Sequence, residues 1–351
     1  MAPAVKTPGK RRGRKLRIVL LVHEALLPPE DVSGMDAKEV ALIRTELNVY
    51  EGLKALGHEV RLVGVYDELA PLRRALSEMQ PDVVFNLLEE FHDQVIYDAH
   101  VVGYLELKGA AYTGCNPRGL VIARDKALSK KILAYHRIRV PRFAVMPRHR
   151  KPYRPKQLGF PLIVKSLVHE GSQGIAQASV VHNDDALSER VGFIHQSLSA
   201  DAIVEQYIPG RELYVAVIGN HRLKVLPTWE IFLDALPDEA PKIATSRVKW
   251  DLDFQIKHNI RIARAENLPP EVERSVARQA RRIVRTLGID GYVRIDFRLS
   301  EDGLLYFLEA NPNPDISYGE EFTSAAEAGG LDYEPLLSHL VSLGIRRKTQ
   351  G

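Results

Sequence analysis

The residues best suited to chemistry lie near the end of the chain, in two short apolar runs. Asp296 lies within VRIDFR, and Glu309 and Asn311 end the run FLEANPN. Residues two apart on a strand share a face, and the Asp302-Gly303 step between the runs predicts a tight hairpin. Oxygen donors on two paired strands favour a hard cation such as Mg2+, with Mn2+ as a substitute, whose shell phosphate oxygens and water would complete.

The same residues could instead be ordinary solvent-facing positions of two strands. The apolar neighbours on both sides argue against this, because acids among them would need a partner or a metal. Arg294 is two residues from Asp296 and shares its face, so its guanidinium could hold the oxygens of a transferring phosphoryl group. The pattern alone leaves both interpretations open.

Two lysines and a short loop could contact phosphate. Lys126 begins a predicted helix, and Lys165 ends the apolar strand PLIVK. The loop after this strand opens with Glu170, Gly171 and Ser172, and its glycines would let backbone N–H groups approach phosphate closely. A tight connection between two strands explains the loop equally well.

The segment EQYIPGRE could hold a nucleoside. Backbone groups between Gln206 and Ile208, on either side of Tyr207, could pair with an adenine edge, while Glu205 could accept from the exocyclic amine. Glu212 could accept from ribose hydroxyls. A proline-glycine turn flanked by exposed acids is the structural alternative.

The first segment that must position these groups, residues 16–120, alternates strand and helix. This order predicts a three-layer parallel sheet, whose ligands would collect at the carboxyl ends of the strands, near His23, Asn86 and Glu89. The expected strands are 16–22, 59–65 and 82–88, and the expected helices are 37–56, 69–79 and 95–107.

Two further segments follow, over residues 121–200 and 201–345. The second segment opens with a helix at 125–135, and its strands are expected at 142–146, 162–167 and 178–181. The third segment holds strands at 203–208 and 213–218, a long helix at 270–287, the hairpin, and closing helices at 321–328 and 333–343. The many basic residues within 1–15 predict a disordered basic tail, and the alternative is that this tail makes a weak contact with an anionic surface.

Composition limits the class of protein. Of the 351 residues, 45% are hydrophobic and 26% are charged, and the formal net charge is +3, as in ordinary globular domains. Ile18–Val22 is too short to span a bilayer. Without the basic tail the body is slightly acidic, so no specific nucleic-acid partner is expected. The single cysteine, Cys115, allows no intrachain disulfide, which favours a cytoplasmic location.

Taken together, these motifs resemble the ATP-grasp superfamily, and most closely the D-alanine–D-alanine ligases. The resemblance spans roughly residues 80–345 and rests, in family order, on YTGCNPRGLVIARDKALSKKIL, PLIVK with the EGS loop, EQYIPGRE, VRIDFR and FLEANPNPDIS. It implies an α/β (α+β) ATP-grasp fold behind an N-terminal three-layer parallel-sheet domain. Residues 121–200 would form the central lid subdomain, and 201–345 the C-terminal catalytic subdomain.

The resemblance also implies a role for each site residue. ATP would be held by Lys126, Lys165, Glu170, Gly171, Glu205, Gln206, Tyr207, Ile208 and Glu212, and two Mg2+ ions by Asp296, Glu309 and Asn311. Lys249, in RVKWD, would close over the γ-phosphate, and Arg294 and Ser172 would join it in catalysis. The implied reaction phosphorylates a carboxylate to an acyl phosphate, which an amine then attacks. Both substrates would be small molecules such as amino acids, and a homodimer is the default assembly.

Several positions depart from the family pattern. FNLLEEFHDQ lacks the family's histidine-glycine-rich segment, and Asp315 and Glu320 stand near positions where the family commonly has a glycine and a serine. With Glu321, these acids suit a cationic group better than a free carboxylate. We therefore expect a ligase with substrates other than D-alanine. The alternatives are an authentic D-alanine–D-alanine ligase and a non-catalytic ATP-binding module of the same fold.

Overall fold

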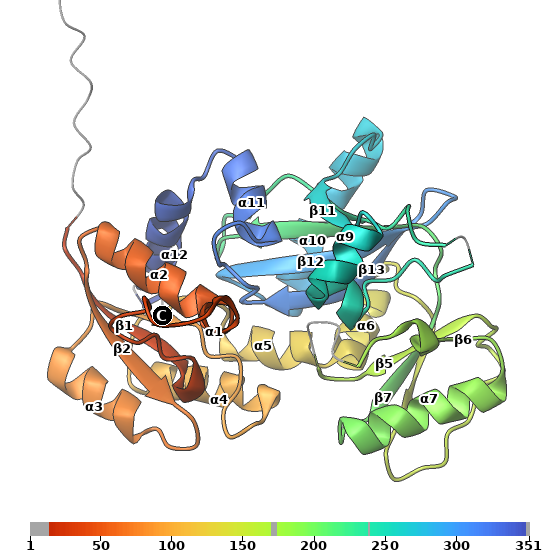
Figure 1. Cartoon of the computed structure of the whole chain (residues 1–351), viewed down its shortest axis with the longest axis horizontal. Coiled ribbons are helices and arrows are strands. Elements are labelled where there is room, and N and C mark those ends of the chain that lie inside the picture. The colour runs from red at the N-terminus through yellow and green to blue at the C-terminus, as the bar shows by residue number, and fades with distance from the viewer. Residues whose placement is uncertain (1–13, 170–173, 238, 349–351) are drawn as a thin grey trace, which may run out of the picture.

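The chain forms an N-terminal sheet, a central sheet and a large C-terminal sheet, and in space the C-terminal sheet lies between the other two (Figure 1). The structure is a computed structural model, and it describes residues 14–169, 174–237 and 239–348. The basic tail expected at residues 1–15 lies almost wholly outside the described residues, as does the part of the EGS loop that holds Glu170, Gly171 and Ser172. No helix among the described residues combines the length and apolar composition needed to cross a bilayer.

The N-terminal sheet is parallel, with the strand order β2-β1-β3, as the alternating sequence predicts. Alternate residues of β1 enter two different clusters, Val19 and Leu21 on one face and Ile18 and Leu20 on the other, so both faces are covered. Its strands are β1 (Arg17–His23), β2 (Glu59–Val65) and β3 (Val83–Asn86). The helices of this segment are α1 (Ala37–Leu42), α2 (Arg44–Ala55), α3 (Ala70–Met79) and α4 (Asp98–Leu107), with short 3-10 turns η1 (Glu24–Leu26) and η2 (Val95–Tyr97).

One predicted helix of this segment is divided in the structure. The sequence predicts a single helix over 37–56, but Ile43 has φ −106° and ψ 13°, which separates α1 from α2. The new start at Arg44 matters for the site, because it places the first turn of α2 beside the loop after the last strand of the C-terminal sheet. Thr45 Oγ1 donates there to Asp315 Oδ1 at 2.8 Å.

The central sheet is antiparallel, with the order β4-β7-β5-β6. Its strands are β4 (Phe143–Met146), β5 (Leu162–Ser166), β6 (Val180–Val181) and β7 (Ala202–Gln206), and η3 (Gln177–Ser179) precedes β6. The helix α7 (Asp184–Ser197), which the sequence analysis did not predict, packs Leu187, Val191 and Ile194 onto one face of this sheet. β7 belongs to this sheet although it lies beyond residue 200.

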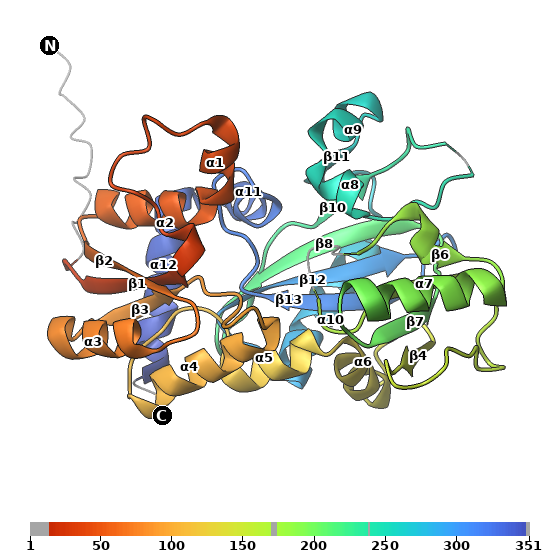
Figure 2. The same cartoon turned by 60° about the horizontal axis from the view of Figure 1, so that its bottom comes forward.

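The C-terminal sheet has the order β11-β10-β8-β12-β13, with β9 paired to β8. Its strands are β8 (Arg211–Ile218), β9 (Lys224–Val225), β10 (Trp229–Phe232), β11 (Arg261–Arg264), β12 (Tyr292–Leu299) and β13 (Leu305–Pro312). One face packs against α5 (Pro117–Arg124), α6 (Lys126–Tyr135) and α10 (Pro270–Leu287), as Figure 2 shows. The remaining helices are α8 (Ser246–Trp250), α9 (Leu252–Lys257), α11 (Glu321–Ala328) and α12 (Tyr333–Lys348), the last of which returns to pack against α2 and β3.

The hairpin predicted from the Asp-Gly step is confirmed. β12 and β13 are paired antiparallel, and β12 is also paired along its whole length with β8, so it lies inside the sheet. The register shifts between Asp296 and Phe297, which marks a β-bulge beside the expected metal residues. On the face opposite Asp296, Val293, Ile295 and Phe297 join the core beneath α10.

Candidate active site

The expected metal residues meet on one face of the hairpin. Asp296 is directly opposite Glu309 in the register, and Arg294 is opposite Asn311. Arg294 Nε and Nη2 donate to the two carboxylate oxygens of Asp296 at 2.8 and 3.0 Å, and Asn311 Nδ2 donates to Asp296 Oδ2 at 3.1 Å. The remaining guanidinium nitrogen, Arg294 Nη1, donates to Glu321 Oε1 at 3.1 Å, so this arginine joins the hairpin to the first turn of α11.

A cluster of lysines faces the same hairpin from α6 and β5. Lys126 Nζ lies 3.5 Å from Glu309 Oε2, and it donates to the carbonyl of His169 at 2.6 Å. Lys165 Nζ lies 3.3 Å from Glu205 Oε2, so both lysines that were expected to hold phosphate pair with acids of the candidate site. The structure thus brings α6, the central sheet and the C-terminal sheet together at this point.

Lys130 belongs to this cluster and was missed by the sequence analysis. Its side chain is fully buried, its Nζ lies 2.8 Å from Glu205 Oε1, and it also donates to the carbonyl of Leu308. Lys126 and Lys130 are four residues apart on one helix, a spacing that places both on the same face. That spacing was the signal that could have identified Lys130.

The lysines determine the charge state of the acids beside them. Burial raises the pKa of Glu309, but Lys126, Lys165 and Lys249 outweigh it and lower that pKa to about 2. Burial likewise opposes ionisation of Glu205, and Lys130 and Lys165 outweigh it and lower its pKa. Both carboxylates are therefore ionised within a positively charged surrounding, which suits a site for the phosphates of a nucleotide.

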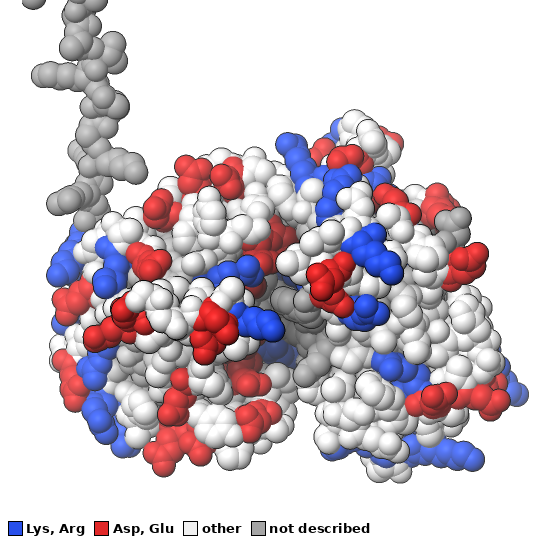
Figure 3. Space-filling view, in the orientation of Figure 1, with Lys and Arg blue, Asp and Glu red and all other residues white. Residues whose placement is uncertain are grey.

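Most of the expected nucleotide residues line one narrow cavity between the central and C-terminal sheets. Those that line it are Lys165, Glu205, Gln206, Tyr207, Ile208, Glu212, Lys249, Asp296 and Glu309. The cavity has a volume of about 50 Å³, well below the roughly 300–1,000 Å³ of typical ligand sites. Figure 3 shows the outer surface hollowed beside this region, with acidic and basic side chains at the rim.

At the strand end that was expected to contact adenine, two backbone N–H groups already donate hydrogen bonds to neighbouring segments of the protein. The N–H of Gln206 donates to the carbonyl of Arg142 at 2.8 Å, and the N–H of Tyr207 donates to the carbonyl of Pro161 at 3.2 Å. Glu212 is 9% exposed and pairs with Arg298 Nη2 at 2.9 Å. Arg298 also lines the cavity and was missed; its position two residues after Asp296 was the available signal.

Lys249 approaches the site from the opposite side. It lies on the short helix α8, whose first turn is capped by Thr245 Oγ1 accepting from the N–H of Val248 at 3.2 Å. Its Nζ lies 5.7 Å from the centre of the Tyr214 ring, and it lowers the pKa of Glu309 together with the other lysines. Ser172, Glu170 and Gly171 lie outside the described residues, so the structure does not place them.

A second cluster, which we call the acidic end, lies where α2 meets the loop after β13. It consists of Glu46, Asp315 and Glu320. Arg44 pairs with Glu320, and Thr45 donates to Asp315, so the first turn of α2 holds this loop. Glu46 is only 5% exposed, and burial, with a smaller contribution from Asp315, raises its pKa to about 7. Burial and Asp315 also raise the pKa of Glu320, against the effect of Arg44.

The hairpin residues fit a magnesium ion in their chemistry. Burial raises the pKa of Asp296, and the facing Glu309 adds to this, whereas Arg294 opposes it. A cation between the two carboxylates would relieve their repulsion, and Asn311 offers an amide oxygen beside them. Within the described ranges no group of three His, Cys, Asp or Glu side chains could hold a metal, so a metal at the hairpin would be held by two carboxylates and an amide.

The arrangement is that of an ATP-grasp enzyme, with a cluster of cationic and acidic side chains between two antiparallel sheets. The family model for the D-ala D-ala ligase C-terminus matches residues 132–342. The chain belongs to the D-alanine–D-alanine ligase family, and it is an ATP-dependent ligase that forms a C–N bond.

Its relatives include proteins with and without an assigned activity. An uncharacterized protein, y4sG of Sinorhizobium fredii, is 30% identical over 86% of this chain and 87% of its own length. The D-alanine–D-alanine ligase of Desulfotalea psychrophila is 30% identical over 96% of this chain and 98% of its own. A crystal structure of the D-alanine–D-alanine ligase from Bacillus anthracis complexed with ATP has a TM-score of 0.73 at 22% identity, covering 95% of this chain and 99% of that one. This last likeness supports the fold.

Proposed function

We propose that this ligase uses ATP and Mg2+ to join a carboxylate to an amine substrate that carries a second positive charge, rather than to D-alanine. The observation that carries the proposal is the acidic end, where Glu46, Asp315 and Glu320 lie close together and Arg44 pairs with Glu320. Two of these carboxyl groups have raised pKa values, so a further cation would stabilise them.

The nucleotide would occupy the narrow cavity. Lys126, Lys165 and Lys249 would contact its phosphates, because they surround Glu309 and already lower its pKa. The carbonyl of Gln206 and the N–H of Ile208 would pair with the adenine edge, since the N–H groups of Gln206 and Tyr207 donate into the sheet. Glu205 would both anchor the lysines and face the exocyclic amine, and Glu212 would accept from the ribose.

The central sheet would have to move for ATP to enter, because the cavity of about 50 Å³ is much smaller than a nucleotide. We infer that the moving unit extends to Gln206, since β7 is paired with β4 and β5. Asp296, Glu309 and Asn311 would hold the metal. Bound Mg2+ neutralises charge on the phosphates during transfer.

The reaction would proceed in two steps. A carboxylate oxygen of the first substrate attacks the γ-phosphorus, the bond to the bridging oxygen breaks, and ADP leaves with an acyl phosphate remaining. The amine nitrogen of the second substrate then attacks the acyl carbon, phosphate leaves, and the nitrogen loses a proton. Arg294 is positioned to stabilise the transferring phosphoryl group, because its guanidinium is held between Asp296 and Glu321.

The departures from the family pattern support the choice of amine. Asp315 and Glu320 stand near positions where the family commonly has a glycine and a serine, and both contact the first turn of α2. A neutral side chain on the amine substrate would bring no positive charge to the carboxylates of the acidic end. An amine with a second cationic group, such as a diamino acid, would place that group between acids that are otherwise close to one another.

Product analysis tests the proposal. The chain is incubated with ATP, Mg2+ and a panel of carboxylates and amines that includes diamino acids, neutral amino acids and D-alanine, and products are identified by mass spectrometry. We expect ADP release and an amide product with a cationic amine, and neither with Asp296→Ala. D-alanyl-D-alanine as the main product would refute the proposed amine class and establish the family's namesake activity.

A further inference from the structure

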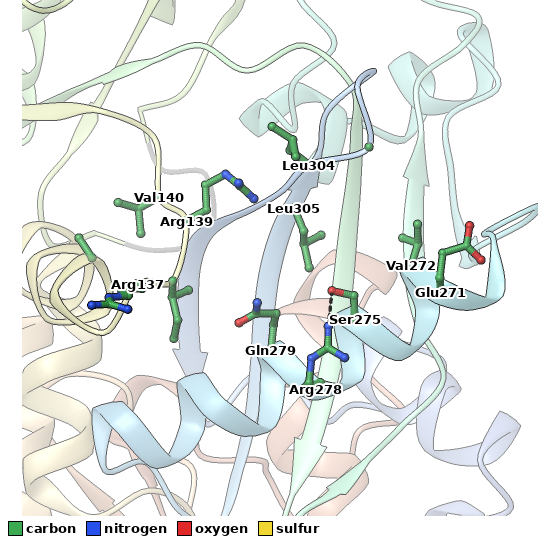
Figure 4. A pocket seen from close by; sticks show the side chains of 13 residues that line it. Arg137, Arg139, Val140, Glu271, Val272, Ser275, Arg278, Gln279, Leu304 and Leu305 are labelled. Atoms are coloured by element: carbon green, nitrogen blue, oxygen red, sulfur yellow. Dashed lines mark hydrogen bonds between the residues drawn. The ribbon is translucent and has the colours of Figure 1, made fainter.

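A second cavity lies away from the nucleotide site, at the far side of the C-terminal sheet. It has a volume of about 680 Å³, within the roughly 300–1,000 Å³ range of small-molecule sites. α10 forms one wall, the segment after α6 forms the other, and the hairpin residues Leu304 and Leu305 lie between them (Figure 4). Because α10 covers the face opposite Asp296, this cavity is separate from the active site.

Three arginines line this cavity. Arg137 and Arg139 come from the segment after α6, and Arg278 comes from α10. Among the described residues none of the three lies within 4.0 Å of a carboxylate, whereas Glu271 is the one acid in the lining. Arginine side chains on a surface are common, but three that converge on one hollow with a single acid leave a net positive cavity.

The contacts of these arginines leave their guanidinium groups accessible. Arg139 lies with its guanidinium carbon 5.6 Å from the centre of the Tyr306 ring, which fixes its direction while leaving its N–H groups available. Arg278 Nη2 lies 3.4 Å from Ser275 Oγ, one turn earlier on α10 (Figure 4). Planar guanidinium groups bind phosphate and carboxylate through paired hydrogen bonds.

An unsatisfied acceptor adds an independent observation. Gln279 Oε1 is buried and has no hydrogen-bond partner in the described part of the chain, and Gln279 lines the same cavity. A buried amide oxygen without a donor costs free energy, so a ligand that brings a hydroxyl or an N–H group would be favoured there. The cavity therefore offers arginine side chains to the anionic groups of a ligand and the Gln279 amide oxygen to its hydrogen-bond donor.

We propose that this cavity binds a small polyanion, a molecule with two or more phosphate or carboxylate groups and at least one hydroxyl group. The site lies at the ends of α6 and β13 that are opposite Lys126 and Asn311, so its occupant would contact two elements that also form the active site. The proposal is independent of which substrates the ligase joins.

Isothermal titration tests the proposal with two probes, fructose 1,6-bisphosphate and citrate, which distinguish phosphate from carboxylate chemistry. We expect at least one probe to bind the full chain and to bind about tenfold or more weakly when Arg139→Gln and Arg278→Gln are combined, because charged hydrogen bonds are lost. Arg274→Gln, on the same helix but outside the lining, is the matched control and should bind as the unaltered chain does.

The lysine cluster of the nucleotide site could also attract these probes. Lys165→Met addresses this, because a probe held in the arginine cavity should bind that variant unchanged. Binding that Lys165→Met abolishes, or that the double arginine variant retains, would overturn the proposal. So would the absence of any heat with both probes. Circular dichroism of each variant confirms that it is folded.

Discussion

The two ends of the active site differ in the sign of the charge that surrounds their acids. At the nucleotide end, Lys126, Lys130, Lys165 and Lys249 surround Glu205 and Glu309. At the acidic end, the three acids Glu46, Asp315 and Glu320 lie near Arg44, which pairs with Glu320. A site that joins two different substrates can therefore use one end for an anion and the other for a cation.

The pKa directions express the same contrast. Burial opposes ionisation at both ends, yet the pKa of Glu309 falls to about 2, because lysines outweigh burial. The pKa of Glu46 rises to about 7, because no cation offsets burial there. The pKa values of these two buried carboxyl groups thus shift in opposite directions, and each end can be tested by changing its charge.

The largest effect is expected at the hairpin. Asp296→Ala should reduce ATP-dependent product formation by about a thousandfold, since it removes a proposed metal ligand and leaves Arg294 without its bidentate partner. A coupled assay for ADP release measures this. Asp302→Asn, at the exposed turn of the same hairpin, is the control and should keep its activity. Similar losses in both variants would contradict the proposed role of Asp296.

The next effect is on stability at the nucleotide end. Lys130→Met should lower the free energy of unfolding by about 3 kcal/mol, because it removes one of two cations from the buried Glu205. Chemical denaturation measures it, and Lys131→Met, one residue away on the exposed face of α6, should change little. Adding Glu205→Gln to Lys130→Met should recover part of the loss. An equal effect of the two lysine variants would show that the pair contributes nothing.

The nucleotide end could largely be predicted from the sequence, because its signals are local. The pairing of β12 with β13 follows the prediction, since an Asp-Gly turn between two apolar runs favours a hairpin. The register shift between Asp296 and Phe297, which the sequence analysis did not predict, then places Asp296 opposite Glu309 and Arg294 opposite Asn311. Lys130 was missed although its spacing from Lys126 was available, since a lysine in a helix is usually exposed.

The acidic end could be predicted only in part. Asp315 and Glu320 were identified as departures from the family pattern, but their neighbours Arg44 and Glu46 were not. The hydrogen bond from Thr45 to Asp315 joins residues 270 positions apart, so no local pattern reveals it. It depends on α12 returning to α2 and on the helix break at Ile43, and both are consequences of tertiary packing.

A pH dependence is expected from Glu46. Its folded-state pKa of about 7 exceeds the ordinary glutamate value of 4.5, so the native state keeps the proton to a higher pH than the unfolded state does. Stability should therefore fall as the pH rises from about 4.5 to about 7, by about 3 kcal/mol. Glu46→Gln should remove this fall and be the more stable form at pH values above 7. Denaturation curves at several pH values measure it.

The control for this experiment lies on the same helix. Glu51→Gln replaces an exposed glutamate of α2 and should keep the pH dependence of the unaltered chain. A cationic amine should also stabilise the unaltered chain more than it stabilises Glu46→Gln, because the charge of the amine lowers the pKa of the carboxyl group. If Glu46→Gln and the unaltered chain follow the same pH profile, the acidic end does not carry the unmatched charge that we infer.

The smallest expected effect is on substrate choice. Glu320→Gln leaves Arg44 without its carboxylate, which makes the acidic end less negative. The preference for a cationic amine over a neutral one, measured as a ratio of kcat/KM values, should fall about tenfold. Glu327→Gln, on the exposed side of α11, is the control. A loss of kcat/KM for both amines in equal proportion would mean that Glu320 only holds α2 in place, whereas a changed ratio requires that its charge reaches the substrate.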